Sequence, residues 1–145
     1  MTQYTWKSNI FSSKTAIARD HKNIGYFSIN FFGVTRMELL HQEYRCKRTG
    51  FLGKTLELYA TRASEPMAIL IFHTWKRSVS ITYKQTAYQM KYDSLLGSRF
   101  KMYHDDNIIY TYHPSFASGT METDTDDPLL ITLGIYAHIR RRNNT

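Results

Sequence analysis

A segment near the end of the chain constrains the fold more than any other feature. In residues 129–139, Thr132 and His138 are the only strongly polar members, so a helix built from this segment has no polar stripe. A helix that is apolar on every side must be buried on every side. With about twelve apolar residues, it falls well short of the ~20 needed to cross a bilayer. We therefore expect a helix enclosed by the rest of the protein, with Gly134 allowing a strand to approach it closely.

Both ends of this helix are marked in the sequence. Asp126 or Asp127 can cap the free N–H groups of the first turn, and Pro128 suits the first helical position. The arginine run at residues 140–142 suits the negative end of the helix dipole. The predicted helix spans about residues 127–142.

Most of the remaining chain alternates apolar and polar residues with a period of two, which is typical of half-buried strands. Residues 77–83 place Val79 and Ile81 on one face and hydroxyl side chains on the other, and residues 86–92 repeat the pattern. Only Lys84 and Gln85 separate these two segments, which predicts a hairpin. We expect strands at residues 5–10, 14–18, 24–32, 34–40, 43–47, 54–60, 67–75, 77–83, 86–92, 98–104 and 108–112.

One of these segments differs from the others. Residues 67–72 are apolar at nearly every position, which predicts a strand covered on both faces or one that changes face at a bulge. Polar turns separate the strands at short intervals, and no linker or change of composition divides the chain. The sequence therefore predicts a single domain over residues 1–145, mainly β, with strands from about 4 to 121 forming a sandwich or barrel.

Consecutive hairpins around a hydrophobic C-terminal helix resemble the plan of the tubby C-terminal-like superfamily. This superfamily includes tubby-like, LURP-one-related and phospholipid scramblase-like proteins. The resemblance covers about residues 4–142, and it is carried by the strand–turn–strand units at residues 16–25 and 100–112 and by the helix at residues 126–142. It implies an antiparallel β-barrel of about twelve strands that encloses the C-terminal α-helix. It also implies binding to membrane lipids or phosphoinositides.

The charge of the chain favours an anionic partner. The net charge is +7, and a basic balance attracts nucleic acid or an anionic membrane surface. Alternation points the basic residues of two adjacent strands away from the core, and further basic residues follow at the end of the helix. We predict an anion-binding face made of Lys91, Arg99, Lys101, Arg140, Arg141 and Arg142. Lysine and arginine bind phosphate directly. The alternative is a solvated strand face that only keeps the protein in solution.

An acidic segment precedes the helix, where scramblase-like proteins carry a segment proposed to bind calcium. Here the segment holds Glu122, Asp124, Asp126 and Asp127. It lacks the central glycine and the twelfth-position glutamate of an EF-hand loop. We therefore expect a solvated loop and a helix cap, with no metal and no cofactor. Calcium at Asp124, Asp126 and Asp127 is the alternative.

No catalytic motif is present in the sequence. It contains no GxSxG, HExxH, P-loop, GxGxxG or CxxC pattern. Turn chemistry explains Asp105 and Asp106 beside His104, and a buried core position explains His138, which should stay neutral. Alternation places Cys46 in a buried strand, where a thiol is inert. We expect no enzymatic activity.

These features predict a non-enzymatic binding module that recognises anionic phospholipid or phosphoinositide headgroups at a membrane surface. The alternatives are a lipocalin-like small-molecule carrier, with the helix packed outside a hollow barrel, and a protein-interaction domain. Nucleic acid ranks lower, because alternation points the aromatic rings at residues 44–47 and 88–92 towards the core. The first eleven residues contain no long apolar run and no cleavage signal, so we expect a cytoplasmic protein peripheral to a membrane.

Overall fold

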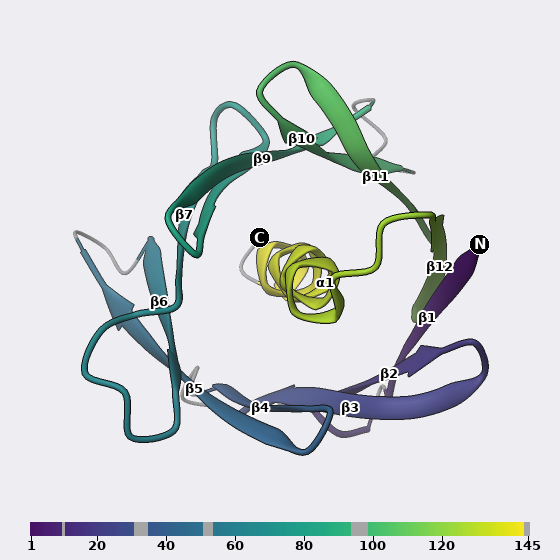
Figure 1. Cartoon of the computed structure of the whole chain (residues 1–145), viewed down its shortest axis with the longest axis horizontal. Helices are drawn as coiled ribbons and strands as arrows, with labels where there is room; N and C mark the ends of the chain where they lie inside the picture. Colours follow the sequence, from purple (N-terminus) through teal and green to yellow (C-terminus); the bar gives the residue numbers. More distant parts are fainter. Residues whose placement is uncertain (10, 31–34, 51–53, 94–98, 144–145) are drawn as a thin grey trace.

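The computed structural model of the chain describes residues 1–9, 11–30, 35–50, 54–93 and 99–143. Twelve antiparallel strands form a closed barrel with one helix inside it (Figure 1), which confirms the predicted architecture. The elements are β1 (Thr2–Ser8), β2 (Lys14–Arg19), β3 (Lys22–Ile29), β4 (Thr35–Leu39), β5 (Gln42–Thr49), β6 (Thr55–Ala60), β7 (Ala68–His73), β8 (Ser78–Tyr83), β9 (Thr86–Tyr92), β10 (Phe100–His104), β11 (Asn107–Pro114), β12 (Ser118–Thr123) and α1 (Pro128–Asn143).

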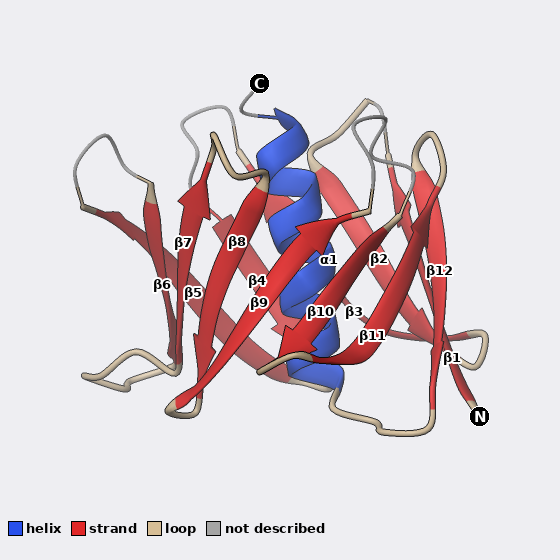
Figure 2. Ribbon diagram, turned by 90° about the horizontal axis from the view of Figure 1, so that it is seen from above, coloured by secondary structure: helices blue, strands red, loops and turns tan. Residues whose placement is uncertain are grey.

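Each strand pairs with the next one along the chain, and β12 pairs with β1 to close the barrel. In this order, alternate connections lie at the same end of the barrel. Helix α1 follows β12 and runs through the barrel from the end where β1 begins to the end where β1 finishes (Figure 2). We name these the entry end, which includes the turn at Asp20 and His21, and the exit end, which includes the turn at residues 115–117.

Tight two-residue turns join strands at the entry end. Both residues of three such turns have positive φ, between 48° and 69°; these are Asp20-His21, Leu40-His41 and Lys84-Gln85. Two consecutive residues with positive φ form the type I′ hairpin turn, whose twist matches that of the flanking strands. The hairpin predicted at Lys84 and Gln85 is therefore confirmed, although neither residue is a preferred type for this turn.

The start of α1 is capped as the sequence predicts. The Oδ1 atom of Asp127 accepts a hydrogen bond from the backbone N–H of Leu130 at 3.3 Å, and the carbonyl of Asp127 accepts one from Ile131 at 3.0 Å. Pro128 occupies the first helical position, where its missing N–H costs no hydrogen bond. The observed helix closely matches the predicted bounds of about 127–142.

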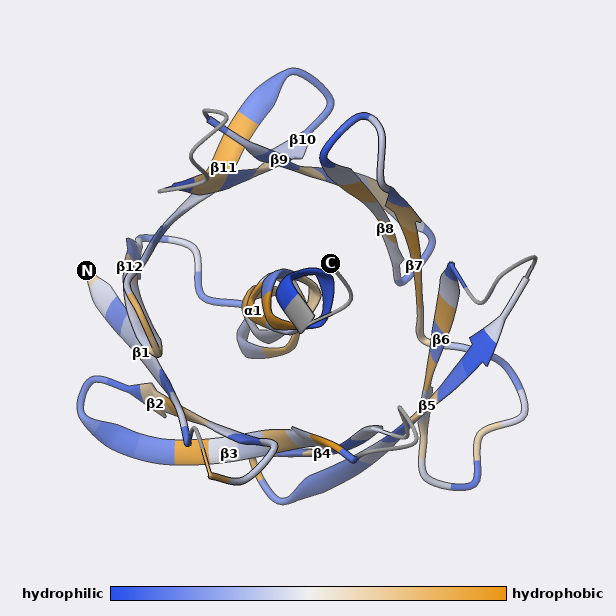
Figure 3. Cartoon of the chain, turned by 180° about the vertical axis from the view of Figure 1, so that it is seen from behind, coloured by the Kyte–Doolittle hydropathy of each residue, from blue (hydrophilic) through white to orange (hydrophobic). Residues whose placement is uncertain are grey.

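The helix is enclosed on all sides, as its composition requires. Every residue from 129 to 140 is buried, and Figure 3 shows the hydrophobic turns of α1 at the centre of the barrel. Tyr112 of β11 reaches the helix and donates a hydrogen bond to the Ile131 carbonyl at 3.1 Å. A Cβ atom at Gly134 would lie 2.8 Å from Cζ of Tyr112, so the glycine permits this contact. Within the described residues, no helix is both long and apolar enough to cross a bilayer.

The strand predicted at residues 67–75 differs from the observed β7. The strand ends at His73, and only one of its faces is buried against the core. Ile71 lies on the outer face with 40% of its surface exposed, and no irregularity occurs in the pairing of β7 with β6 or β8. The expectation of two covered faces or a bulge was therefore wrong, because a run of apolar residues does not require that both faces be covered.

The last strand, β12, was not delimited as a separate strand, although the predicted strand region extends to about residue 121. Its buried positions hold Gly119, Met121 and Thr123, so only Met121 supplies a large apolar side chain to the pattern. A Cβ atom at Gly119 would overlap the indole of Trp6, which fills this space from β1. At this position of β12, the apolar side chain that fills the core is therefore Trp6 of β1, so the sequence of β12 itself shows only a glycine. The predicted strand ends at residues 10, 32, 34 and 98 lie outside the described residues, as does residue 31 within the predicted strand 24–32.

Candidate functional site at the exit end of the barrel

Basic residues collect at the exit end. We assign to each end its turns and the two strand residues nearest to them. The cationic residues that lie at the exit end by this definition, or in the last turn of α1, are Lys7, Lys14, Arg36, Arg48, Lys54, Lys76, Arg77, Lys91, Arg99, Lys101, Arg140, Arg141 and Arg142. In the described part of the chain, Asp93 is the one acidic residue at this end.

Acidic residues predominate at the entry end, which also holds Arg19, Lys22, Arg62 and Lys84. The chain has twelve acidic residues, of which Glu57 lies in the middle of β6 and Asp93 at the exit end. The others belong to the entry end, and they are Asp20, Glu38, Glu43, Glu65, Asp105, Asp106, Glu122, Asp124, Asp126 and Asp127. The barrel is therefore polarised along the helix axis, with a positive field at the exit end.

Three exposed aromatic rings also lie at the exit end. Phe11 in the β1–β2 turn is 93% exposed, Trp75 in the β7–β8 turn is 96% exposed, and Phe116 in the β11–β12 turn is 87% exposed. Because alternate connections share one end of the barrel, all three turns lie at the same rim (Figure 2). In the rest of the described chain, no phenylalanine, tyrosine or tryptophan side chain is exposed. The exit end thus combines cations with unburied apolar rings.

The structure brings three of the predicted site residues together on β9 and β10, and two of them are paired with an acidic residue. Asp93 forms ion pairs with Arg99 at 3.5 Å and with Lys101 at 3.3 Å. Lys91 lies opposite Lys101 in the pairing of β9 with β10, and its Nζ atom lies 5.3 Å from the ring centroid of Tyr103. This cluster points away from the core, but Asp93 offsets part of its positive charge.

The three predicted arginines at the end of α1 have different environments. Arg140 is 2% exposed, and its Nη1 atom donates to Oγ1 of Thr35 at 3.3 Å inside the barrel. It is therefore not on the surface with the other predicted residues. Arg141 is half-buried, with its Cζ atom 4.4 Å from the ring centroid of Tyr92. Arg142 is exposed, and it donates to the carbonyl of Phe116 at 3.3 Å.

A cavity of about 580 Å³ opens at the exit end between α1, the β1–β2 region and the β11–β12 turn. Its lining includes the buried residues Thr15 and His138 and the cationic residues Lys14 and Arg142. The polar lining is completed by Asn9 and by the hydroxyls of Ser8, Ser12, Ser13 and Ser115. The cavity therefore presents two cations and several hydroxyl groups at the rim.

An apolar groove of about 660 Å³ is continuous with this cavity. Phe11, Ala16, Phe116 and Ala117 line it, and it shares Phe116, Ala117, Lys14 and several polar residues of the β1–β2 region with the cavity. The two exposed phenylalanines thus flank a path from the basic cavity to the outside of the barrel.

His138 borders the cavity as a neutral side chain. Its Nδ1 atom lies 2.7 Å from the Tyr92 hydroxyl, and its ring stacks on Phe100 with the centroids 4.7 Å apart. Burial, followed by the nearby charges of Arg142 and Arg141, lowers the pKa of His138 to about 4. The positive charge at this end therefore comes from lysine and arginine near neutral pH.

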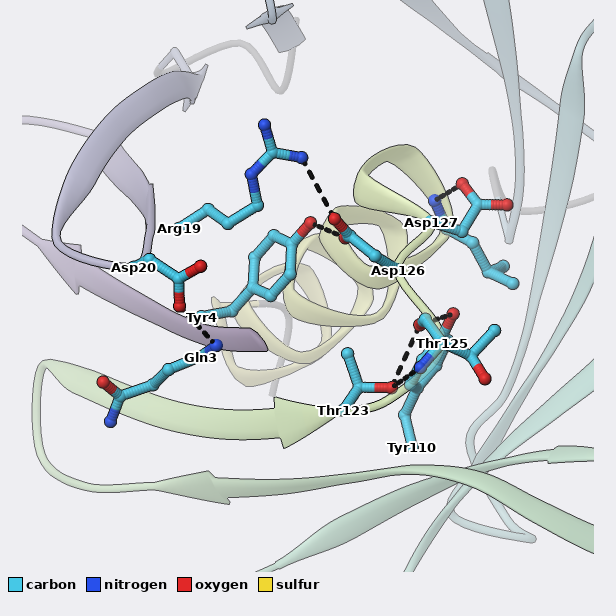
Figure 4. Close-up of polar contacts among 10 residues, drawn as sticks. Gln3, Tyr4, Arg19, Asp20, Tyr110, Thr123, Thr125, Asp126 and Asp127 are labelled. Atoms are coloured by element: carbon cyan, nitrogen blue, oxygen red, sulfur yellow. Dashed lines mark hydrogen bonds and ion pairs between the residues drawn. The ribbon is translucent and has the colours of Figure 1, made fainter. Parts of the chain in front are cut away.

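The acidic segment before α1 is engaged in protein contacts (Figure 4). Tyr4 donates a hydrogen bond to Asp126, and Arg19 forms an ion pair with the same carboxylate at 3.2 Å. Tyr83 donates to Asp127, which also caps the helix, whereas Asp124 is exposed. Among the described residues, no group of three or more His, Cys, Asp or Glu side chains is arranged to hold a metal ion.

Cys46 and His104 are the two other side chains considered as candidate reactive groups. Cys46 lies in β5, and burial raises the pKa of its thiol to about 11, although Tyr136 and Arg140 act in the opposite direction. A thiol with such a pKa carries little thiolate near neutral pH. His104 lies 4.0 Å from Asp105, and both side chains are exposed near the β10–β11 turn.

The three exposed rings were missed by the sequence-based prediction, although a signal for them exists. Each is a single aromatic residue in or beside a predicted turn, and Trp75 was assigned to the strand that ends at His73. In an up-and-down barrel, the connections after β1, β7 and β11 must share one end. Since Phe11, Trp75 and Phe116 each follow an odd-numbered strand, an up-and-down barrel topology would have placed all three on one rim.

No protein-family model, curated protein or solved structure matches this chain. The arrangement of residues at the exit end is thus the basis on which a function is proposed.

Proposed function

We propose that the protein is a non-enzymatic module that binds anionic lipid headgroups at a membrane surface, with the exit end of the barrel facing the bilayer. The observation that carries this proposal is the segregation of positive charge and exposed aromatic rings to one end of the barrel axis. In this proposal the protein is peripheral to the membrane.

The charge distribution favours one orientation at an anionic surface. Each lysine or arginine held near such a surface contributes about 1 kcal/mol, and the attraction decays within a Debye length. The exit end offers many such residues around its rim, whereas the acidic residues at the entry end are repelled. A barrel that approaches with its exit end therefore gains the attraction and avoids most of the repulsion.

The exposed rings add an apolar contribution at the same end. Tryptophan and phenylalanine side chains are favourable at the boundary between headgroups and acyl chains. Phe11, Trp75 and Phe116 are almost fully exposed, so they are available to enter this boundary without unfolding of the barrel. Charge supplies the attraction to the surface, and the rings supply contact with the bilayer.

The alternative functions are less well supported by the same geometry. A lipocalin-like carrier needs a hollow barrel, and α1 occupies the interior here (Figure 1). Nucleic-acid stacking on the rings of Tyr44, Tyr88 and Tyr92 is disfavoured, because these rings pack against the core. The resemblance to the tubby C-terminal-like superfamily favours the lipid-binding proposal, since it implies membrane-lipid binding for this type of barrel.

Vesicle flotation across a salt series tests this proposal. We expect the protein to float with vesicles that contain phosphatidylserine and not with phosphatidylcholine vesicles. Binding should weaken steeply as salt rises, because the attraction is mainly electrostatic. Absence of binding to anionic vesicles at low salt would contradict the proposal.

A further inference from the structure

We propose that the exit-end cavity binds the phosphate group of a phosphomonoester lipid, and that the adjacent apolar groove takes the start of its hydrocarbon chain. The inference rests on the proposed function for the membrane source of this ligand. It adds a site of defined chemistry to a surface that otherwise attracts any anionic lipid.

Two cationic side chains, one from β2 and one from α1, line the cavity. Lys14 is held at the start of β2, with its Nζ atom 4.3 Å from the ring centroid of Tyr26. Arg142 comes from the last turn of α1 and is linked to the β11–β12 turn through the carbonyl of Phe116. Arg142 lines the cavity and contributes the positive charge of its guanidinium there. A dianionic phosphomonoester fits two cations better than a singly charged phosphodiester does.

Hydroxyl groups complete the donor set. The hydroxyls of Ser8 and Thr15 lie 2.9 Å apart. In a hydroxyl pair one group donates to the other, and the second retains its own hydrogen for a further acceptor. Ser12 and Ser13 add two exposed hydroxyls at the cavity mouth. The three terminal oxygens of a phosphomonoester are acceptors that match such donors.

The helix end by itself would disfavour an anion. The last carbonyl groups of a helix carry negative partial charge, equivalent to about half an elementary charge. Here the last turn of α1 also carries Arg141 and Arg142, whose full positive charges outweigh that partial charge. The local field in the cavity is therefore positive despite the orientation of the helix.

The groove identifies the ligand as a lipid rather than a free phosphate ester. It leads from Lys14 between Phe11 and Phe116, and both rings are almost fully exposed to water without a ligand. A hydrocarbon chain that leaves the phosphate along this path would cover apolar surface on both rings. A small phosphate ester would leave that surface exposed.

The test compares lipids that differ in phosphate chemistry but not in surface charge. Phosphatidylcholine vesicles receive either phosphatidic acid, a monoester, or phosphatidylglycerol, a diester, in amounts that give equal zeta potential. The variant K14Q/R142Q removes both cavity cations. The control variant K76Q/K91Q removes the same charge from the same end but outside the cavity. The variant Ser13→Asp places a negative charge at an exposed position of the cavity mouth, as a second probe if K14Q/R142Q does not fold.

We expect the wild-type protein to bind phosphatidic acid vesicles roughly fivefold more tightly than phosphatidylglycerol vesicles, as one additional charge contact at the surface would give. The variants K14Q/R142Q and Ser13→Asp should lose this preference, and K76Q/K91Q should keep it while binding both vesicles more weakly. No preference in the wild type, or a preference that survives in Ser13→Asp or in folded K14Q/R142Q, would overturn the cavity site and leave general anionic binding intact.

A soluble probe separates the phosphate site from the membrane. Glycerol 3-phosphate should shift the amide resonances of Ser12, Ser13 and Lys14 in the wild-type protein. If these shifts occur and neither vesicle binds, the phosphate site is supported and its membrane source is overturned together with the proposed function. If neither the shifts nor vesicle binding occurs, both proposals are overturned.

Discussion

The guanidinium of Arg141 stacks over the ring of Tyr92, with its Cζ atom 4.4 Å from the ring centroid. Tyr92 ends β9 beside Lys91 and Asp93, and its hydroxyl also contacts His138 of α1. The end of the central helix is thus fixed to the rim that carries the basic cluster. This contact joins the enclosed helix, which stabilises the fold, to the surface that is proposed to act on membranes.

The variant Arg141→Lys separates the structural role of this contact from its charge. Lysine keeps the positive charge but loses the planar group that stacks on the tyrosine. We expect the free energy of unfolding, measured by urea denaturation, to fall by about 0.5–1 kcal/mol. Vesicle binding should stay within twofold of wild type, as roughly expected when the net charge is unchanged. A large loss of binding in a folded variant would show that the guanidinium itself contacts lipid.

Removal of the acidic side chain of Asp93 at the exit end should strengthen membrane binding. Asp93→Asn deletes a negative charge and releases Arg99 and Lys101 from their ion pairs. We expect binding to anionic vesicles to tighten by roughly fivefold, which corresponds to about 1 kcal/mol for one charge near the surface. The free energy of unfolding should fall by about 1 kcal/mol or less, because ion pairs near a protein surface contribute about 0–1 kcal/mol.

Asp105→Asn is the matched control for this change. It alters the net charge equally but lies in a turn at the entry end, where the side chain is exposed. The polarised barrel predicts that Asp105→Asn has a much smaller effect on vesicle binding than Asp93→Asn. Equal effects of the two variants would mean that total charge, and not its position, controls the interaction.

Gly134→Ala should destabilise the protein, although alanine is the better helix former by about 1 kcal/mol. The added Cβ would lie 2.8 Å from Cζ of Tyr112 and 3.1 Å from Cε of Met102. Tyr112 cannot retreat easily, because it stacks on Phe100 at 4.4 Å and bonds to the Ile131 carbonyl. Overpacking costs about 1–3 kcal/mol, and the better helix propensity of alanine offsets about 1 kcal/mol of this, so we expect a net loss of up to roughly 2 kcal/mol in thermal or urea denaturation. Full additivity with Tyr112→Phe would argue against this clash.

His138 should make stability depend on pH. The unfolded imidazole titrates near 6.5 and the folded one near 4, so the unfolded state binds more protons between these values. Stability contributed by neutral His138 is therefore present above about pH 6.5 and is lost as the pH falls towards 4. This pKa difference corresponds to a loss of roughly 3 kcal/mol in the free energy of unfolding once His138 is fully protonated.

Comparison with His138→Gln isolates this contribution, because the carboxylates titrate in both proteins. The urea midpoint of the wild type should fall more between pH 7 and pH 4 than that of the variant. Parallel curves for the two proteins would show that His138 does not titrate in the way its environment indicates.

The enclosing barrel could be predicted from the sequence because one helical segment has to be buried on every side. Residues 129–139 have no polar face, and the capping residue Asp127 and Pro128 define where the helix starts. The hairpins follow from alternation, which reports burial on one face of each strand. Where burial is shared with another strand, as at Gly119 and Trp6, alternation within one segment gives no signal.

The candidate site was harder to predict, because it depends on which turns share an end. Lys91, Arg99 and Lys101 were identified from alternation, but the ion pairs of Arg99 and Lys101 with Asp93 depend on the pairing of β9 with β10. Arg140 was grouped with its neighbours in the sequence, yet helix periodicity turns it inwards to Thr35 while Arg142 faces the rim. A run of like residues on a helix therefore does not form one surface.

The fluorescence of Trp75 tests the orientation of the barrel at the membrane most directly. The chain has two tryptophans, and Trp6 is 2% exposed whereas Trp75 is 96% exposed. Any change of emission on vesicle binding should therefore report on Trp75, and Trp75→Phe provides the control. With anionic vesicles we predict a blue shift, quenching by lipids brominated near the headgroup, and loss of both signals in Trp75→Phe. Binding to anionic vesicles with no change in Trp75 emission would contradict the proposal that the exit end faces the bilayer.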